Sequence, residues 1–216
     1  VQLNVWHTEF EGLITTSTLN REFEAEARGE TNYVVRCTAS DQCQEGTVNY
    51  VSLTSNNYKG VTMEGIDFDI NYVMDTDNMG RFDMGVNAAK ITKYIYQRFA
   101  SDSVESNEGE MGLPDTRMTP YLTWGKGDWG VGLTGYHVSG QETDYFGTPY
   151  SVDDSMTFNL RVSYQLPWDA SVSLGAINVT DEEPEQNSDW YGWEPFDFTL
   201  YDTRGRTVYI TYEQSL

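Results

Sequence analysis

Ile66-Asp67-Phe68-Asp69-Ile70-Asn71-Tyr72 is the stretch that decides the fold, because its apolar and polar residues alternate without a break. Successive side chains of a β-strand point to opposite sides, so one face of this segment carries Ile, Phe, Ile and Tyr. The other face carries Asp, Asp and Asn. The fold therefore has to provide an apolar environment on one side of the strand and a polar environment on the other.

The same alternation recurs along the chain, at residues 82–88, 117–124, 129–133, 156–166 and 170–174. Counting such segments gives about eight strands, which we expect near residues 1–15, 57–74, 81–100, 116–125, 128–142, 154–166, 169–180 and 204–214. Each can meet the ~9–11 residues that a tilted transmembrane strand needs. Residues 48–53 are predicted to form an additional strand inside the first long loop.

Composition limits the class of protein. The 216 residues suit one domain or one piece of a larger one. A net charge of −21 argues against nucleic-acid binding, which requires a basic face. No apolar run approaches the ~18 residues of a spanning helix, and 15 Tyr favour an all-β chain over a disordered one. Because the chain begins at Val1 without a signal-like segment, we expect either a removed leader or a downstream fragment.

Two architectures produce this alternation. A soluble β-sandwich buries the apolar face against a second sheet, whereas a transmembrane barrel turns it toward lipid and encloses the polar face. The polar faces carry charges and amides that suit a water-filled interior: Asp67, Asp69, Asn71, Asn159, Arg161 and Gln165. Aromatic residues gather beside short turns, as in the interfacial girdles of membrane barrels: Trp124, Trp129, Tyr164 and Trp168.

The connections also favour the barrel. Turns near residues 75–80, 125–128 and 167–169 are short, whereas segments 16–56, 101–115, 143–153 and 181–203 are long, polar and acidic. Outer-membrane barrels have short turns on one side and long loops outside the cell. The sequence therefore predicts an all-β fold of antiparallel transmembrane barrel strands. Two features fit poorly: Lys90 and Thr92 require a bulge or an exit from the membrane, and Pro120 lacks the N–H donor of a paired strand.

The end of the chain resembles TonB-dependent outer-membrane receptors. Residues 175–184, Gly-Ala-Ile-Asn-Val-Thr-Asp-Glu-Glu-Pro, are similar to the family's penultimate strand, which runs into an Asn-Leu-Phe-Asp segment. Residues 201–209, Tyr-Asp-Thr-Arg-Gly-Arg-Thr-Val-Tyr, are similar to the Tyr-Asp-x-x-Gly-Arg-x-x-Tyr start of its last strand. Further matches lie in residues 65–68, 113–114 and 124–129, so the resemblance covers nearly the whole chain.

The resemblance implies a place in a larger receptor. Residues 1–216 align with the carboxyl-terminal third or so of a barrel whose 22 strands enclose a plug domain, and nothing in them resembles the plug. Such receptors capture a scarce ligand, most commonly a ferric siderophore, and TonB supplies the energy that displaces the plug. The implied partners are a small-molecule ligand, the plug and upstream strands, TonB through the plug, and the lipid and lipopolysaccharide of the bacterial outer membrane. A transporter is implied, with no enzyme activity and no cofactor.

Cys37 and Cys43 lie in the first long loop. Their five-residue spacer is not a zinc pattern and neither His is nearby, so we expect a disulfide and no metal site. An oxidising compartment favours that bond, and the related receptors often carry a similar pair. Closing so short a loop contributes about 2 kcal/mol by the chain-entropy relation.

Large aromatic side chains in polar loops are the candidates for ligand contact: Trp190, Tyr191, Trp193 and Tyr145. Packing against another loop is an equally good account of them. On the barrel wall, the residues expected to face the lumen and to hydrogen-bond the plug or solvent are Asp67, Asp69, Asn71, Asn159 and Arg161. Among these, Arg161 is the best candidate for an ion pair between wall and plug.

Two other functions remain open. An open sheet in lipid leaves unpaired N–H and C=O groups that cost several kcal/mol each. About eight strands must therefore pair with missing strands or close on themselves as a small structural or adhesive barrel. A small barrel could also be a lipid-modifying enzyme using His137 and Ser139, but these two lack an orienting carboxylate and an oxyanion donor.

Overall fold

The computed structural model describes residues 1–31, 33–53, 55–97, 104, 106–145, 147–187 and 195–214. The chain divides into two compact units. The first comprises residues 1–8, 63–94 and 106–216, and the second comprises residues 9–62 and 95–105.

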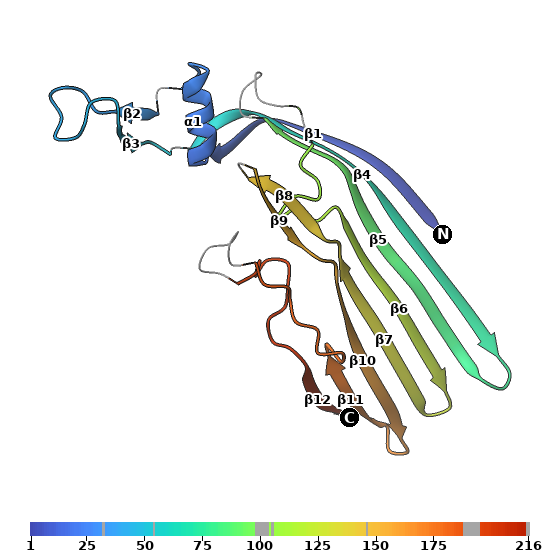
Figure 1. Ribbon diagram of the computed structural model, residues 1–216. Coiled ribbons are helices and arrows are strands. Elements are labelled where there is room, and N and C mark those ends of the chain that lie inside the picture. Colours follow the sequence, from blue (N-terminus) through green and yellow to red (C-terminus); the bar gives the residue numbers. More distant parts are fainter. Residues whose placement is uncertain are drawn as a thin grey trace. The chain divides into compact units, whose positions relative to one another are not determined.

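Eight strands form one sheet in the order β1, β4, β5, β6, β7, β10, β11, β12 (Figure 1). Their bounds are Gln2–Thr16 for β1, Ser55–Thr76 for β4, Gly80–Gln97 for β5, Thr116–Lys126 for β6, Trp129–Val138 for β7, Ser155–Leu166 for β10, Ala170–Ile177 for β11 and Thr207–Gln214 for β12. These bounds confirm the eight expected strands. Within the described part of the chain, β1 and β12 each have a neighbour on one side only, so the sheet is open.

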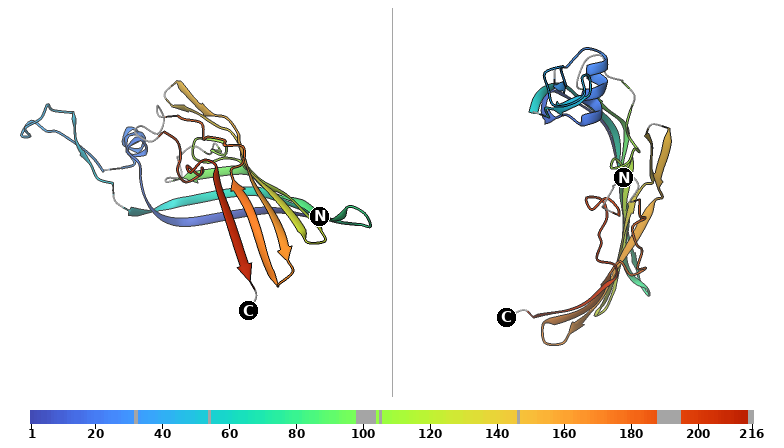
Figure 2. Two further views of the ribbon diagram at one scale, coloured as in Figure 1. Left: turned by 90° about the horizontal axis from the view of Figure 1, so that it is seen from below. Right: turned by 60° about the vertical axis from the view of Figure 1, so that its left-hand side comes forward.

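The strand register gathers the apolar residues on one face. Directly opposite residues of antiparallel strands project to the same side, and one row of opposite residues crosses six strands: Phe82, Trp124, Val131, Val162, Leu174 and Ile210. Leu174 and Ile210 are 58% and 75% exposed, respectively. In the first unit these strands form a single layer (Figure 2). Among the described residues, no second large sheet covers the apolar face, which is contrary to a sandwich.

Short and long connections lie at opposite ends of the strands of the first unit. Residues 77–79, 127–128 and 167–169 make the short turns of the β4–β5, β6–β7 and β10–β11 hairpins. Residues 106–115, 139–145, 147–154, 178–187 and 195–206 lie at the other end (Figure 1). This is the arrangement of connections predicted from the sequence.

The structure accounts for both misfits. Pro120 lies opposite Val86 of β5. The register between β6 and β7 is the same on both sides of Pro120, with Met118 opposite His137 and Tyr121 opposite Thr134. Lys90 stays in unbroken register with β6, so this pairing contains no bulge.

Lys90 lies opposite Thr116, the first residue of β6. Its Nζ lies 2.9 Å from Asp115 Oδ2, so the ammonium group is at the loop end of the strand. This position agrees with the second expectation, that the strand has left the apolar region by Lys90.

The second unit contains a helix and a hairpin within residues 16–56, where the sequence predicts a long loop with one strand. Helix α1 (Leu19–Ala27) begins at Thr18, whose side chain accepts a hydrogen bond from Arg21 N. Strands β2 (Val34–Arg36) and β3 (Val48–Val51) pair as a hairpin, which confirms the strand expected within residues 48–53. No helix of the described residues is long and apolar enough to cross a membrane.

The loop between β7 and β10 is a second hairpin. Strands β8 (Gln141–Tyr145) and β9 (Thr148–Val152) pair antiparallel with Gln141 opposite Val152. Both of these residues are buried, so this hairpin is packed at its base. The sequence predicts a long, polar, acidic loop over residues 143–153, and the structure shows that most of it is paired in this hairpin.

Candidate functional site

The polar residues of β4 lie on the face opposite the apolar row and bond to neighbouring strands. Trp6 Nε1 donates a hydrogen bond to Asp67 Oδ1 at 3.2 Å. Asn71 Nδ2 donates to Asp83 Oδ1 and to the Tyr121 hydroxyl, both at 2.6 Å. The polar face is therefore a connected hydrogen-bond surface across β1, β4, β5 and β6.

Asn159 and Arg161 occupy the same face on β10. Asn159 lies opposite Thr134, and Thr134 lies opposite Tyr121, which places it on the side of Asn71. Arg161 Nη2 donates a hydrogen bond to Ser173 Oγ at 2.8 Å. The five residues predicted to line the interior thus share one face, in two groups on β4 and β10.

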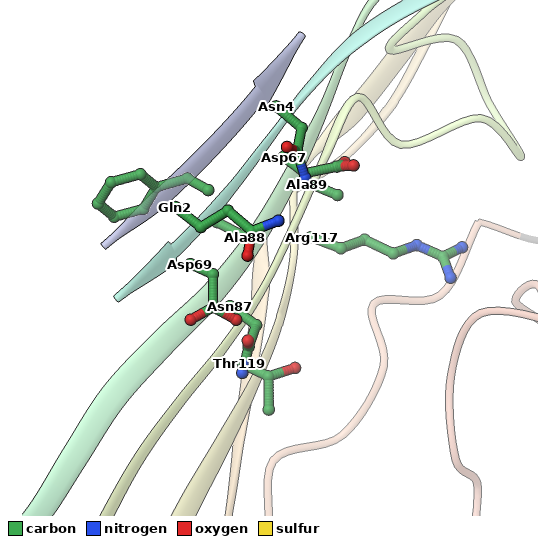
Figure 3. A pocket seen from close by; sticks show the side chains of 10 residues that line it. Gln2, Asn4, Asp67, Asp69, Asn87, Ala88, Ala89, Arg117 and Thr119 are labelled. Carbon is green, nitrogen blue, oxygen red and sulfur yellow. The ribbon is translucent and has the colours of Figure 1, made fainter. Parts of the chain in front are cut away.

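A cavity of about 360 Å³ opens on this face beside β1, β4, β5 and β6. Asp67, Asp69, Asn87 and Thr119 line it, and Figure 3 shows Arg117 directed away from the two carboxylates. Apolar residues, Phe68, Ala88 and Ala89, also line the cavity, so its wall combines polar and apolar groups.

A second cavity, of about 350 Å³, lies between β7 and β10 and the last long loop. Tyr136, Thr157 and Asn159 line it from the polar face of the sheet. Tyr201 and Arg204 line it from the loop. A cavity of this size is at the lower end of the ~300–1,000 Å³ typical of small-molecule sites.

The loop that covers this cavity is fixed at both of its ends. Asn178 Nδ2 donates a hydrogen bond to Glu182 O at 2.8 Å, and Asn178 Oδ1 accepts one from Glu182 N at 3.0 Å. Asp181 Oδ1 accepts from Arg206 N at 2.8 Å, and Arg206 Nη2 lies 3.5 Å from Asp181 Oδ2. These four residues, which we call the loop clasp, join the end of β11 to the start of β12.

Within that loop, Asp202 holds Arg204. Arg204 Nε and Nη2 both donate to the Asp202 carboxylate, at 3.1 and 2.7 Å to the nearer oxygens. These hydrogen bonds, the Arg204 N–H and the guanidinium charge lower the pKa of Asp202 to about 2. Nη1 of Arg204 is not engaged by this carboxylate.

Gln141 connects three loops beside the cavity. Its Oε1 accepts a hydrogen bond from Gly112 N at 2.7 Å, and its Nε2 donates to the Tyr201 hydroxyl at 3.1 Å. Burial is the main cause that raises the pKa of Tyr201, so this phenol stays protonated. Neither Gln141 nor Tyr201 was singled out from the sequence, although Tyr201 begins a motif of the family.

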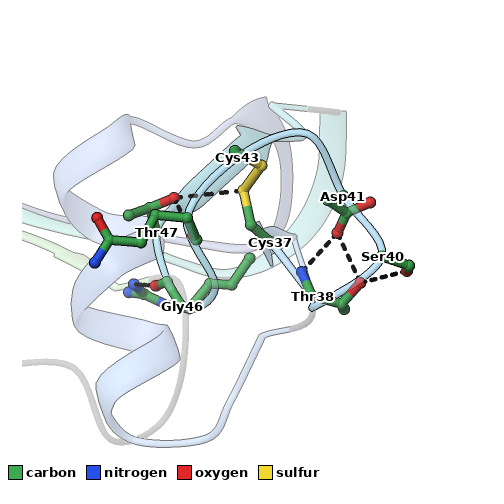
Figure 4. Close-up of a disulfide and its surroundings, with 9 residues drawn as sticks. Cys37, Thr38, Ser40, Asp41, Cys43, Gly46 and Thr47 are labelled. Carbon is green, nitrogen blue, oxygen red and sulfur yellow. Dashed lines mark hydrogen bonds between the residues drawn. A yellow bond between two sulfur atoms is a disulfide. The ribbon is translucent and has the colours of Figure 1, made fainter.

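The first long loop carries the predicted disulfide between Cys37 and Cys43 (Figure 4). Asp41 Oδ2 accepts hydrogen bonds from Thr38 N at 2.6 Å and from Thr38 Oγ1 at 2.8 Å. The Thr38 N–H is the main cause that lowers the pKa of Asp41. Among the described residues, no group of three or more His, Cys, Asp or Glu side chains is placed to hold a metal ion.

The aromatic residues predicted to contact ligand are not placed by the structure. Trp190, Tyr191 and Trp193 lie outside the described residues. Tyr145 ends β8 opposite Thr148, but its side chain also lies outside what is described.

His137 and Ser139 make separate contacts. His137 lies opposite Met118 and Met156 on the apolar face, with Nε2 3.6 Å from Asp154 Oδ2. Ser139 Oγ accepts a hydrogen bond from Thr116 N at 3.1 Å. His137 thus has a carboxylate neighbour that the sequence interpretation did not foresee, whereas Ser139 is engaged by the β6 backbone.

An open antiparallel sheet with one apolar face, one polar face and long loops at one end defines the class as the wall of a transmembrane β-barrel. Residues 1–179 match the family model described as TonB dependent receptor-like, beta-barrel, and the chain belongs to that family. The family consists of outer-membrane β-barrels. Among curated proteins, none matches the chain by sequence.

Solved structures of this fold come from receptors much longer than the chain. A mutant of the ferric enterobactin receptor PfeA of Pseudomonas aeruginosa is 16% identical, with a TM-score of 0.60 over 99% of this chain and 28% of its own. The siderophore receptor PirA of Acinetobacter baumannii is 13% identical, with a TM-score of 0.61 over 99% and 29%. The copper transporter OprC is 14% identical, with a TM-score of 0.54 over 99% and 28%. At these identities the likeness establishes the fold alone.

Proposed function

We propose that residues 1–216 are the carboxyl-terminal wall, rim and outer loops of a bacterial outer-membrane receptor. The receptor captures a scarce ligand, foremost a ferric siderophore or similar metal chelate, and imports it with energy from TonB. The observation that carries the proposal is a single-layered sheet of the family's fold with one largely apolar face and one largely polar face. The structural neighbours described as siderophore receptors and a copper transporter support this kind of cargo.

The polar face has the chemistry of a wall that encloses a polar plug. We place Asp67, Asp69, Asn71, Asn159 and Arg161 on the lumen side, where they bond the plug or water. Arg161 remains our candidate for an ion pair with the plug, because its hydrogen bond to the neutral Ser173 hydroxyl leaves its charge uncompensated by that contact. Trp190, Tyr191, Trp193 and Tyr145 remain proposed ligand contacts of the outer loops.

The two edges of the sheet support a place within a larger barrel. β1 and β12 each lack a neighbour on one side, and Val5 on β1 and Ile210 on β12 are at least three-quarters exposed. Hydrocarbon does not satisfy free N–H and C=O groups. We therefore propose that upstream strands of the same receptor pair with both edges.

Deleting the gene for the full-length receptor tests this function. Cells are grown under iron limitation, and the uptake of radioactive iron is measured with ferric siderophores as the source, with and without TonB. We expect uptake to be lost both in the deletion strain and in the strain without TonB, and to return with the intact gene. Uptake that persists in the deletion strain, or that does not depend on TonB, would contradict the proposal.

A further inference from the structure

The cavity beneath the last loop is lined by hydrogen-bond donors. Tyr136 and Thr157 lie opposite each other on β7 and β10, and each brings a hydroxyl group to the cavity. Asn159 Oδ1 already accepts a hydrogen bond from Asn178 N at 2.9 Å, which leaves its amino group to donate. Because the Tyr201 hydroxyl accepts from Gln141, its own proton also remains to be donated.

The two charged residues that line this cavity, Asp202 and Arg204, carry opposite charges, whereas the charges that act on Tyr201 are net negative. The Arg204 guanidinium is neutralised by the Asp202 carboxylate through two nitrogens. Asp197 and Glu185 act on Tyr201 as negative charges and Arg117 acts as a positive one. The chain as a whole carries a net charge of −21, which disfavours the approach of an anion.

We propose that this cavity is a ligand site that takes an uncharged, oxygen-rich group, one rich in hydroxyl or hydroxamate oxygens, and that it discriminates against an anionic catecholate centre. Hydroxyl and amide donors pair with neutral oxygen acceptors, while a trianion needs cations that are not already paired. The inference rests on the proposed function and names the ligand chemistry of that receptor. Two sources share this chemistry: a neutral ferric trihydroxamate and a sugar.

The test measures equilibrium binding to the purified full-length receptor. Three probes are compared: a ferric trihydroxamate of zero net charge, a ferric tris-catecholate of net charge −3, and a neutral disaccharide. We expect a neutral probe to bind at least about tenfold more tightly than the tris-catecholate. Tighter binding of the tris-catecholate overturns the inference and leaves the proposed import function standing. Binding of the disaccharide alone supports the inference and overturns the metal-chelate cargo, whereas failure of all three probes to bind overturns the inference.

A conservative variant tests whether the neutral probe binds at this cavity. Thr157→Val removes one hydroxyl with little change in shape, and we expect it to weaken binding of the neutral probe about three- to tenfold. The matched control is Thr211→Val, on the same face of the sheet at β12 but outside the cavity, with no change expected. Equal effects of the two substitutions would overturn the inference.

A second variant tests the charge balance. Asp202→Asn removes the carboxylate that neutralises Arg204, so the cavity gains one positive charge. We expect the affinity for the tris-catecholate to rise about threefold or more, while affinity for the neutral probe changes less than about twofold. An unchanged ratio of the two affinities would show that the pairing of Arg204 with Asp202 is not what excludes the anionic centre, and would overturn the inference.

Discussion

Tyr209 lies over Gly175 on the polar face, where the two residues are directly opposite on β12 and β11. A Cβ added at Gly175 would overlap the Tyr209 ring. Gly65 is covered by the Trp6 ring in the same way, whereas a Cβ added at Gly85 would meet the Ile70 carbonyl oxygen first and the Tyr121 ring next. Each ring fills the space that the missing side chain leaves, so these pairs fix the register of neighbouring strands.

Gly175→Ala should destabilise the full-length receptor by about 1–3 kcal/mol, because the methyl group forces the Tyr209 ring aside. Gly132→Ala is the control on the same face, since a Cβ there would meet Thr123 Cγ2 at 4.0 Å, an ordinary contact. The unfolding midpoint in denaturant measures both. Equal midpoints for the two variants would contradict a role of the ring in register.

Asp202 gives a prediction for low pH. Its folded pKa of about 2 lies below its ordinary value of 3.8, so the carboxylate stabilises the loop above pH 3.8. That contribution is lost as the pH falls toward 2. The carboxyl carbon of Asp202, followed by NMR in the full-length receptor, should therefore titrate with a midpoint near 2. In an Arg204→Gln variant the midpoint should rise toward the ordinary value, and a midpoint that stays low would contradict the assigned cause.

At the scale of elements, the loop clasp holds the two ends of the connection between β11 and β12. Asp181 has a backbone φ of 60°, a conformation that Asp and Asn tolerate better than most residues. Its carboxylate binds Arg206 twice, through the backbone N–H and the guanidinium. The two family motifs that the sequence shows near residues 178–184 and 201–209 are thus joined in space.

Asp181→Ala should speed proteolytic cleavage within residues 182–205 of the folded full-length receptor about fivefold or more, because both contacts to Arg206 are lost. Asp181→Asn keeps an oxygen acceptor and the tolerance for positive φ, so its cleavage should remain within about twofold of the wild type. Limited proteolysis followed by mass spectrometry measures both rates. If alanine and asparagine behave alike, the side chain of Asp181 does not hold the loop.

The disulfide acts on a separate element, the β2–β3 hairpin. Replacing both Cys37 and Cys43 by Ser should increase amide hydrogen exchange in residues 34–51, since closure of this short loop contributes about 2 kcal/mol. The Arg36 guanidinium joins this hairpin to α1 through the Glu26 carboxylate, at 2.6 and 2.7 Å. Because α1 lies outside the loop that the disulfide closes, α1 should keep its protection. Faster exchange in α1 equal to that of the hairpin would show that the two elements unfold together.

The eight strands of the large sheet were predictable from sequence because the alternation of apolar and polar residues is a local property of each strand. Helix α1 and the β8–β9 hairpin were missed because their buried residues are few and partly polar, Glu22 and Ala25 in α1 and Gln141 and Val152 in the hairpin, so they leave no periodic apolar pattern. Because side chains alternate between the two faces of a strand, the sequence alone assigns Asp67 and Asn159 to the polar face. The sequence could not predict the cavity lined by Tyr136 and Tyr201, because that cavity depends on how a long loop folds back over the sheet.

At the scale of the whole molecule, the unpaired edges of the sheet determine whether the chain can fold without the rest of the receptor. Backbone groups along β1 and β12 have no partner strand on their outer sides among the described residues. In a bilayer each such group costs several kcal/mol. An eight-stranded barrel would remove that cost only if β1 met β12, and the strand order shows no such pairing.

Residues 1–216 expressed without the upstream part of the receptor should therefore fail to fold into a closed barrel. After refolding in detergent, the fragment should migrate identically on SDS gels with and without boiling, and trypsin should digest it completely. The full-length receptor treated in the same way should shift its mobility on boiling, because an intact barrel resists SDS. A heat-modifiable, protease-resistant monomer of the fragment would instead show that the strands close on themselves, and would favour the small structural or adhesive barrel over the receptor.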